Sequence, residues 1–146
     1  MARPALETLG TAEYEGTDPG VAELKDMALL TAMYQMFSGV LQAAAMMRTV
    51  DVAPGQTAKD AIAWLGAVLP LAEGYAEVID GRQYDPAPGQ NVAFTNAAVT
   101  SLITASREQG VGADFLEPLK KHLDELAATG RGTADWISVI EQLTIN

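Results

Sequence analysis

Asp26 is the residue whose type and surroundings most suggest chemistry. It directly precedes a run without charge, and Met27, Leu30 and Met33 lie close to its face at helical spacing. A carboxylate among apolar side chains loses hydration, which favours its protonated form and makes it a usable proton donor. Tyr34 follows eight residues later, about 12 Å along a helix axis and about a quarter-turn round. The two side chains could therefore hold opposite sides of one small ligand.

A structural interpretation of the same residues competes with the catalytic one. Asp26 could be the last solvated acid of a helix and Tyr34 could pack in a core, and spacing alone favours this interpretation. Trp64 and Trp136 sit at helical positions where a core role is the default. His122 lies on a charged amphipathic face and is expected to be solvated. With one His and no Cys, the chain has no zinc-ligand spacing, and we expect no metal.

Two glycine pairs begin like a dinucleotide-binding motif and then depart from it. Gly110 and Gly112, and again Gly130 and Gly132, have the first spacing of GxGxxG, but their third positions hold Phe115 and Asp135. No strand is expected before either pair, and the motif requires one. The sequence therefore predicts no nucleotide site in this chain.

The composition limits the classes of partner. The chain has 146 residues, with 9 Lys and Arg against 19 Asp and Glu, and a net charge of −10. This balance argues against nucleic acid or an anionic membrane surface as a partner, because both need clustered cations. The lack of Cys is compatible with a reducing cytoplasm, where we expect the protein. Hydrophobic residues make up 49% and aromatic residues only 6%, so Ala, Leu and Met carry the apolar mass and favour helix.

Capping and breaking residues predict one helix after another and no paired strands. Asp18 and Pro19 are a clear start signal, and nothing stops that helix for roughly 30 residues, about 45 Å. Pro70 should kink or split a later helix. The fold class is therefore all-α, with a long central helix and about four to five shorter ones. The expected helices cover residues 3–9, 18–49, 57–81, 91–108, 114–128 and 133–143.

The long helix contains 21 consecutive residues without charge, Met27 to Met47. Such a run is long enough to span a bilayer, but polar residues interrupt it and basic residues flank it poorly, so we expect no membrane span. A helix without a charged face should be buried nearly all round. A chain of this length can barely surround it, so an intertwined homodimer is favoured over a monomeric bundle.

A set of short runs carries a family resemblance over nearly the whole chain, and the runs around Asp26 and Tyr34 are the most specific. They resemble the C-terminal half of an NADPH-dependent imine reductase or reductive aminase of the β-hydroxyacid dehydrogenase-like superfamily. The runs are Arg3–Gly10, Gly16–Gly20, Leu24–Leu30, Met33–Gly39, Trp64-Leu65, Leu69-Pro70, Asn96–Ala98 and Ser106–Val111.

The resemblance implies an arrangement of domains. In the family, an N-terminal Rossmann domain binds NADPH, and two helical domains wrap around each other in a reciprocal, domain-swapped dimer. Each active site lies between one subunit's Rossmann domain and the other's helical domain. Residues 1–17 would then be a remnant of the interdomain region, and residues 18–146 the helical dimerisation and substrate-pocket domain. Without the Rossmann domain, the isolated chain is expected to bind no cofactor and to be inactive.

The resemblance also implies a site and a reaction. Asp26 matches the family's proton donor and Tyr34 its aromatic partner. The implied reaction transfers a hydride from NADPH to the carbon of a C=N bond of a small imine or amine substrate. The competing hypothesis is a helical dimerisation or small-ligand-binding module without catalysis. The substrate-pocket residues implied are Met33, Phe37, Trp64, Phe94 and Thr95.

Overall fold

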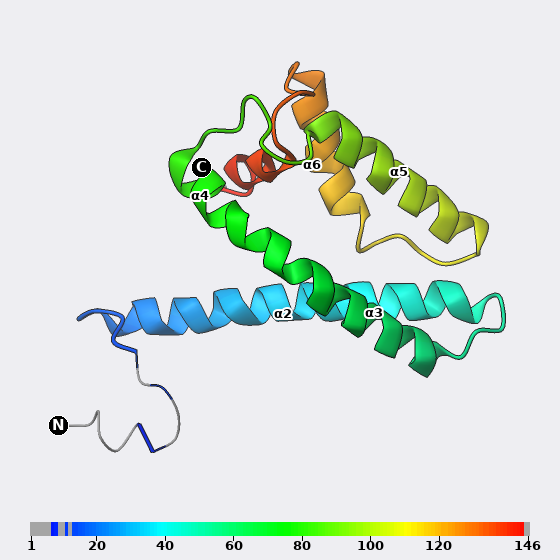
Figure 1. Ribbon diagram of the computed structural model, residues 1–146, viewed down its shortest axis with the longest axis horizontal. Helices are drawn as coiled ribbons and strands as arrows, with labels where there is room; N and C mark the ends of the chain where they lie inside the picture. The colour runs from blue at the N-terminus through cyan, green and yellow to red at the C-terminus, as the bar shows by residue number, and fades with distance from the viewer. Residues whose placement is uncertain (1–6, 9–10, 12, 145–146) are drawn as a thin grey trace. The chain divides into compact units, whose positions relative to one another are not determined.

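The computed structural model describes residues 7–8, 11 and 13–144 of the chain. These residues form helices, and their β-structure is limited to one isolated antiparallel bridge between Asn91 and Asp135. The all-α prediction is therefore confirmed (Figure 1). The helices are α2 (Pro19–Arg48), α3 (Pro54–Val68), the 3-10 helix η1 (Leu69–Gly74), α4 (Tyr75–Gly81), α5 (Val92–Glu108), α6 (Glu117–Ala128) and the 3-10 helix η2 (Trp136–Gln142).

The chain divides into two compact units, one ending at Phe37 and the other beginning at Ser38. The division falls inside α2, which contributes its N-terminal part to the first unit and its C-terminal part to the second. The helix expected over residues 3–9 lies almost entirely outside the described residues.

Helix α2 begins and ends close to where the sequence predicts. The Asp18 carboxylate accepts a hydrogen bond from the Gly20 amide at 2.8 Å, which satisfies a donor that the first turn leaves free. Pro19 starts the helix, where its missing N–H costs nothing. The helix then runs for 30 residues to Arg48. The predicted start signal and length are confirmed.

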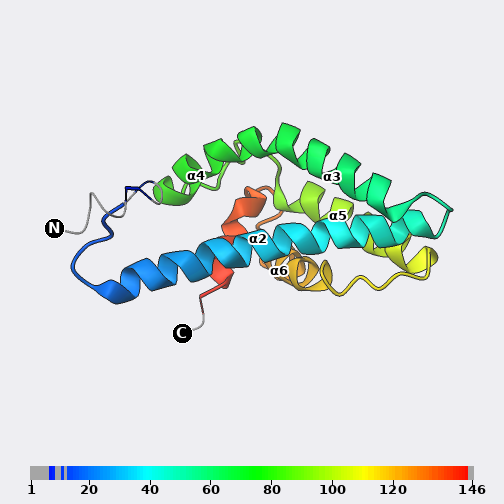
Figure 2. The ribbon, with the colours of Figure 1, turned by 90° about the horizontal axis from the view of Figure 1, so that it is seen from below.

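The predicted break at Pro70 is also confirmed. The backbone leaves α3 at Val68, passes through η1 and resumes as α4 at Tyr75, and Figure 2 shows the resulting bend. The predicted start of this stretch at Thr57 is wrong, since α3 begins one turn earlier, at Pro54. A proline in the first turn needs no cap, and the Thr57 hydroxyl is buried without a hydrogen-bond partner instead of capping the helix.

The last predicted helix is wrong in both its start and its type. Residues 133–143 were expected as an α-helix capped by Thr133, but the structure has η2, and Asp135 caps it by accepting from the Ile137 amide at 3.0 Å. The Asp135 amide donates to the Tyr84 carbonyl at 2.7 Å. Because main-chain pairing with the loop before α5 holds Asp135 extended, no helix can begin before Trp136.

Helix α6 also starts later than predicted, at Glu117 instead of Asp114, because residues 114–116 form a turn. Helix α5 agrees with its prediction, and the Asn91 side chain caps it by accepting from the Phe94 amide at 2.8 Å. Helices α5 and α6 pack together and with η2 to form the core of the second unit. Its buried hydrophobic residues are Tyr84, Val92, Val99, Ile103, Ala113, Leu123, Leu126, Ala134, Ile137 and Val139.

In the single chain most of helix α2 is exposed, so the expected burial of this uncharged helix between two copies stays a prediction. Only Val40 and Ala44 of its residues are buried. Many of its large apolar side chains are exposed, and so are several on α3 and η1. Those on α2 are Val21, Leu24, Met27, Leu29, Tyr34, Met36, Phe37, Leu41 and Met47, and those on α3 and η1 are Ile62, Trp64, Leu69 and Leu71.

One stretch of the described residues, Pro54–Gly81, is long and apolar enough to cross a membrane, judged by length and composition only. The break at Pro70 divides that stretch into α3, η1 and α4. A break of this kind interrupts the helical hydrogen bonds of backbone N–H and C=O groups, which a segment inside a lipid bilayer must keep satisfied. We therefore treat the exposed apolar side chains of this stretch, like those of α2, as a candidate surface for contact with another chain.

Candidate active site

Helix α2 carries four of the predicted site residues. Seven and eleven residues correspond to nearly whole numbers of helical turns, so Met33 and Phe37 share a face with Asp26, and Tyr34 lies about 80° round. Met33 is half-buried, and the other three are exposed, with Tyr34 at 64%. The structure therefore brings these four side chains onto one side of one helix.

The environment of Asp26 differs from the predicted one in one respect. Its side chain is exposed, so the described residues of this chain do not supply the apolar cover that the sequence predicted. The neighbouring residue, Lys25, binds two carboxylates from the segment before α2, Glu13 at 3.0 Å and Glu15 in a closer contact. The hydrogen bonds that the Lys25 ammonium donates, to Glu15 first and to Glu13 second, raise the pKa of Lys25.

This Lys25 cluster was missed by the sequence analysis. Charged residues separated by ten and twelve positions have no fixed relation unless the segment between them turns back. Gly16, with φ of +97°, provides such a turn. In the sequence, the glycine just before the helix start could indicate a turn. A turn alone does not predict which carboxylates Lys25 binds.

The remaining predicted residues lie on other helices, in the second unit. Trp64 on α3 is 65% exposed, so the default core role is wrong for this residue in the single chain. Phe94 and Thr95 are adjacent on α5 but differ sharply, since Phe94 is 60% exposed and Thr95 only 8%. The Thr95 hydroxyl is buried without a hydrogen-bond partner. The side chains of Phe94 and Trp64 are therefore accessible to a ligand or to another chain. Thr95 is on the buried side of α5 and is not accessible in this way.

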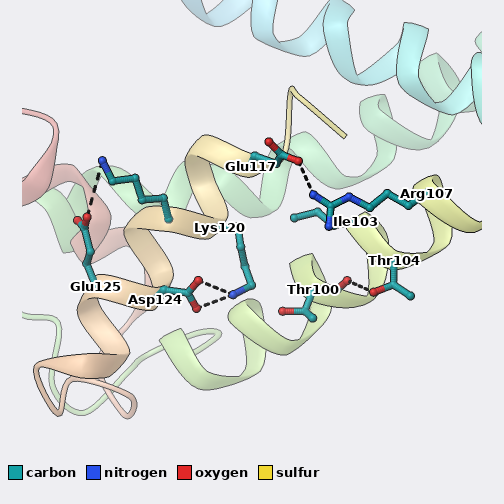
Figure 3. A pocket seen from close by; sticks show the side chains of 9 residues that line it. Thr100, Ile103, Thr104, Arg107, Glu117, Lys120, Asp124 and Glu125 are labelled. Atoms are coloured by element: carbon teal, nitrogen blue, oxygen red, sulfur yellow. Dashed lines mark hydrogen bonds and ion pairs between the residues drawn. The ribbon is translucent and has the colours of Figure 1, made fainter. Parts of the chain in front are cut away.

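A hollow of about 420 Å³ lies between α5 and α6, and none of the predicted site residues lines it (Figure 3). Its three cations face three carboxylates, and Arg107 binds Glu117 at 2.6 Å. The charges of the hollow are therefore satisfied within the protein. Its lining is Thr100, Ile103, Thr104, Arg107, Glu117, Lys120, Lys121, Asp124 and Glu125.

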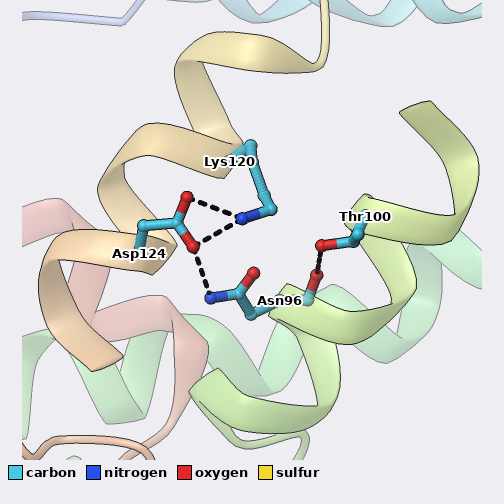
Figure 4. A network of polar contacts seen from close by, with 4 residues as sticks. All are labelled: Asn96, Thr100, Lys120 and Asp124. Carbon is cyan, nitrogen blue, oxygen red and sulfur yellow. Dashed lines mark hydrogen bonds and ion pairs between the residues drawn. The ribbon is translucent and has the colours of Figure 1, made fainter. Parts of the chain in front are cut away.

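Among the residues that line this hollow, Asp124 joins α6 to α5 (Figure 4). Its carboxylate accepts from Lys120 at 2.5 Å and 2.6 Å on its own helix, and from the Asn96 amide at 3.0 Å on α5. These hydrogen bonds, from Lys120 first and Asn96 second, hold the pKa of Asp124 below its ordinary value. The arrangement fastens α5 to α6 and has no unpaired charge to act on a substrate.

The Asn96–Asp124 contact gives a pH-dependent stability. Because the folded pKa of Asp124 is lowered, its contribution is complete above the unfolded pKa, about 4, and is lost as pH falls through the folded pKa. Asn96→Ala is therefore expected to lower the free energy of unfolding more at about pH 6 than at about pH 2, measured by urea denaturation. Thr100→Ala is the control, since its hydroxyl bonds only the Asn96 carbonyl. Equal losses at both pH values in Asn96→Ala would contradict the assignment.

The described residues do not fit the phosphates of a dinucleotide cofactor. Gly110 and Gly130, with φ of +69° and +82°, end α5 and α6, so both glycine pairs follow helices where the motif needs a strand. The cations with the most fixed positions, Lys25, Arg107 and Lys120, bind carboxylates of this chain. Neither glycine pair and none of these three cations is therefore placed to bind the phosphates of a nucleotide.

Comparisons with known proteins agree with the resemblance found in the sequence. Residues 18–144 match the family model described as NADPH-dependent reductive aminase-like, C-terminal domain. The chain is 33% identical over 143 residues to an NADPH-dependent reductive aminase from Aspergillus oryzae (strain ATCC 42149 / RIB 40), covering 96% of this chain and 48% of the relative.

Solved structures show the same similarity. A reductive aminase from Aspergillus terreus, solved with NADPH4, cyclohexanone and allyl amine, has a TM-score of 0.90 and 34% identity, covering 98% of this chain and 50% of that one. An imine reductase from Aspergillus terreus, solved with NADPH4 and a further ligand, has a TM-score of 0.88 and 34% identity over 97% and 49%. The chain spans about half the length of these relatives. It therefore belongs to the family of NADPH-dependent reductive aminase-like C-terminal domains.

Proposed function

We propose that this chain acts as the C-terminal half of an NADPH-dependent imine reductase or reductive aminase, and supplies the substrate-side wall and the proton donor for reduction of C=N bonds. The observation that carries the proposal is the family match over residues 18–144, which includes every described helix. Within that region, Asp26 and Tyr34 lie on an exposed side of α2.

The chemistry assigned to this chain is proton transfer and orientation. Reduction of a C=N bond adds a hydride to carbon and a proton to nitrogen, and forms an amine. When bound, NADPH supplies the hydride, and we assign its site to a part of the enzyme outside the described residues. The Asp26 carboxyl donates the proton to nitrogen, or as a carboxylate stabilises the positive charge of an iminium. The Tyr34 hydroxyl orients the substrate.

The apolar side chains complete the proposed pocket. Met33 and Phe37 share the Asp26 face and would contact the carbon skeleton of a small imine or amine. In the second unit, Trp64 on α3 and Phe94 on α5 are exposed, and their place in a pocket rests on the family resemblance. Thr95 is buried, so its place in the pocket would be indirect, through the position of α5.

A homodimer is part of the proposal. Large apolar side chains are exposed over the whole length of α2, with Leu41 at 66%, and a contiguous surface of this kind is rarely left open to water. A second copy of the chain is the partner that fits, because the 21 residues from Met27 to Met47 contain no charge that a different, charged partner could bind. Cover from a second copy would also exclude water from the surroundings of Asp26. A reducing cytoplasm suits a protein without Cys.

The test is NADPH consumption with a cyclic imine, followed by absorbance. The 146-residue chain alone is expected to form a helical dimer and to show no turnover. A chimaera that joins it to the nucleotide-binding half of the Aspergillus oryzae relative is expected to consume NADPH only when the imine is present. Turnover by the chain alone would contradict the location of the cofactor site. A folded, dimeric chimaera without turnover would favour the non-catalytic dimerisation or ligand-binding module.

A further inference from the structure

Asp135 is a carboxylate that the fold buries without a cation. Only 1% of the residue is exposed. Its oxygens accept hydrogen bonds from two backbone amides, Oδ1 from Ile137 at 3.0 Å and Oδ2 from Gly89 at 3.2 Å. Among the described residues, no Lys, Arg or His forms an ion pair with it. Capping of η2 accounts for Oδ1 but leaves the buried charge uncompensated, whereas buried charges in proteins are usually paired.

A second hollow, of about 190 Å³, lies beside this carboxylate. It is made entirely by the second unit, where α4 and η2 pack against each other (Figure 1). Asp135 lines it, and so do Gly89 and Ile137, the two residues whose amides Asp135 binds. Gly89 lies so near that a Cβ added to it would be 3.4 Å from Oδ2 of Asp135. The carboxylate therefore forms part of the wall of the hollow.

Most of the other side chains around this hollow are apolar, namely Leu71, Tyr75, Val78 and Pro88. The ring of Tyr75 packs edge-on against Trp136, with the ring centroids 6.0 Å apart, which holds the ring in place. Leu71 and Tyr75 are exposed, so the hollow opens to solvent. Its volume equals that of about six water molecules. The shape and lining therefore fit a small ligand with one positive charge and a short hydrocarbon body.

We propose that this hollow binds a small primary amine in its ammonium form, with the nitrogen donating to the Asp135 carboxylate and the hydrocarbon packed against Tyr75 and Val78. A hard metal ion fits less well, because it takes several oxygen ligands and the described residues hold no group of three or more acidic, His or Cys side chains that could bind one. An ammonium needs one carboxylate and also gains from the face of an aromatic ring. None of the predicted site residues lines this hollow, so the inference goes beyond the proposed function and does not depend on it.

The test is an NMR titration of the 146-residue chain at neutral pH with isopentylamine, and with isopentanol, an alcohol of the same shape without the charge. The indole N–H signal of Trp136, which packs on Tyr75, reports binding and is assigned with the variant Trp64→Phe. The amine is expected to bind about 10–100-fold more tightly than the alcohol, as for a hydrogen bond to a charged group. Equal affinities, or no change of the signal with the amine, would overturn the proposal.

Three variants locate the binding. Asp135→Asn removes the charge, keeps an oxygen that can cap η2, and is expected to lower the amine affinity by the same about 10–100-fold. Gly74→Leu leaves Asp135 in place and adds a side chain to the lining, where a Cβ meets no atom within 4 Å and φ is −66°; it is expected to abolish binding.

Gly66→Leu is the matched control for the filled hollow. Gly66 lies on α3, is equally open around its Cβ, and does not line the hollow. Its amine affinity should stay within about 2-fold of the natural sequence, as for a surface substitution. Helical circular dichroism checks that each variant is folded. Natural affinity in a folded Gly74→Leu, or an equal loss in Gly66→Leu, would reject this hollow as the site.

Discussion

Replacement of Asp26 by Asn is expected to lower the turnover of the complete enzyme by about 10²–10⁴-fold, the range for loss of a general acid. The amide has nearly the same shape as the carboxyl group, but it cannot donate a proton to the developing amine nitrogen and cannot balance the charge of an iminium. We therefore expect the loss in kcat to exceed any change in KM. Steady-state NADPH consumption by the chimaera with a cyclic imine measures both constants.

Glu23→Gln is the matched control for this substitution. Glu23 lies on α2 three residues before Asp26 and is exposed, and the change removes one negative charge without touching the proposed donor. Its kcat should stay within about 2-fold of the natural sequence, as for a surface charge. If kcat of Asp26→Asn equals that of Glu23→Gln, Asp26 has no catalytic role. It would then be a solvated surface acid, which is the interpretation that spacing alone favours.

Introduction of a charge into the uncharged run of α2 is expected to dissociate the proposed dimer. Leu41→Glu places a carboxylate where a second copy should lie, and an unpaired buried charge costs about 3–5 kcal/mol. That cost weakens dimerisation by about 10²–10³-fold or more. Light scattering after gel filtration should show a dimer for the natural sequence at micromolar concentration and a monomer for Leu41→Glu.

Ala127→Glu is the control for the dimer experiment. Ala127 is exposed on α6, a different helix from the one that carries the uncharged run, and the substitution adds the same charge. It should leave the molar mass and the helical circular dichroism unchanged. A monodisperse monomer in the natural sequence, or a dimer that survives Leu41→Glu, would contradict the proposed interface.

Helix positions were predictable wherever a capping or breaking residue acts through the local backbone. Asp18 and Asn91 cap the helices that follow them, and Pro70 interrupts one, because these effects depend on only a few neighbouring residues. Thr133 failed as a cap because the segment after it pairs with a distant loop, and Asp135 is held by Tyr84. Pairing between residues so far apart in sequence leaves no signal in either segment.

The candidate site was predictable in part for the same reason. Helical period places Met33 near the face of Asp26, and the family resemblance adds Phe37; the structure has all three on one helix. Exposure could not be predicted, because the burial of an uncharged helix depends on what covers it. Lys25 was missed since its partners lie across a turn at Gly16, and the angle of such a turn depends on tertiary contacts.

The bridge between Asn91 and Asp135 has a consequence for folding. The Val92 amide donates to the Ala134 carbonyl at 2.8 Å, and the Trp136 amide donates to the Gln90 carbonyl at 3.1 Å. These bonds close a loop of chain that contains all of α5 and α6. Closing this loop costs conformational entropy of the chain, and this single cost brings both helices into place. Neither helix can then unfold locally without breaking these main-chain bonds. We therefore expect α5 and α6 to unfold together as one cooperative unit. A protein built almost wholly from local hydrogen bonds thus owes the cooperativity of its core to a few main-chain bonds that join distant parts of the sequence.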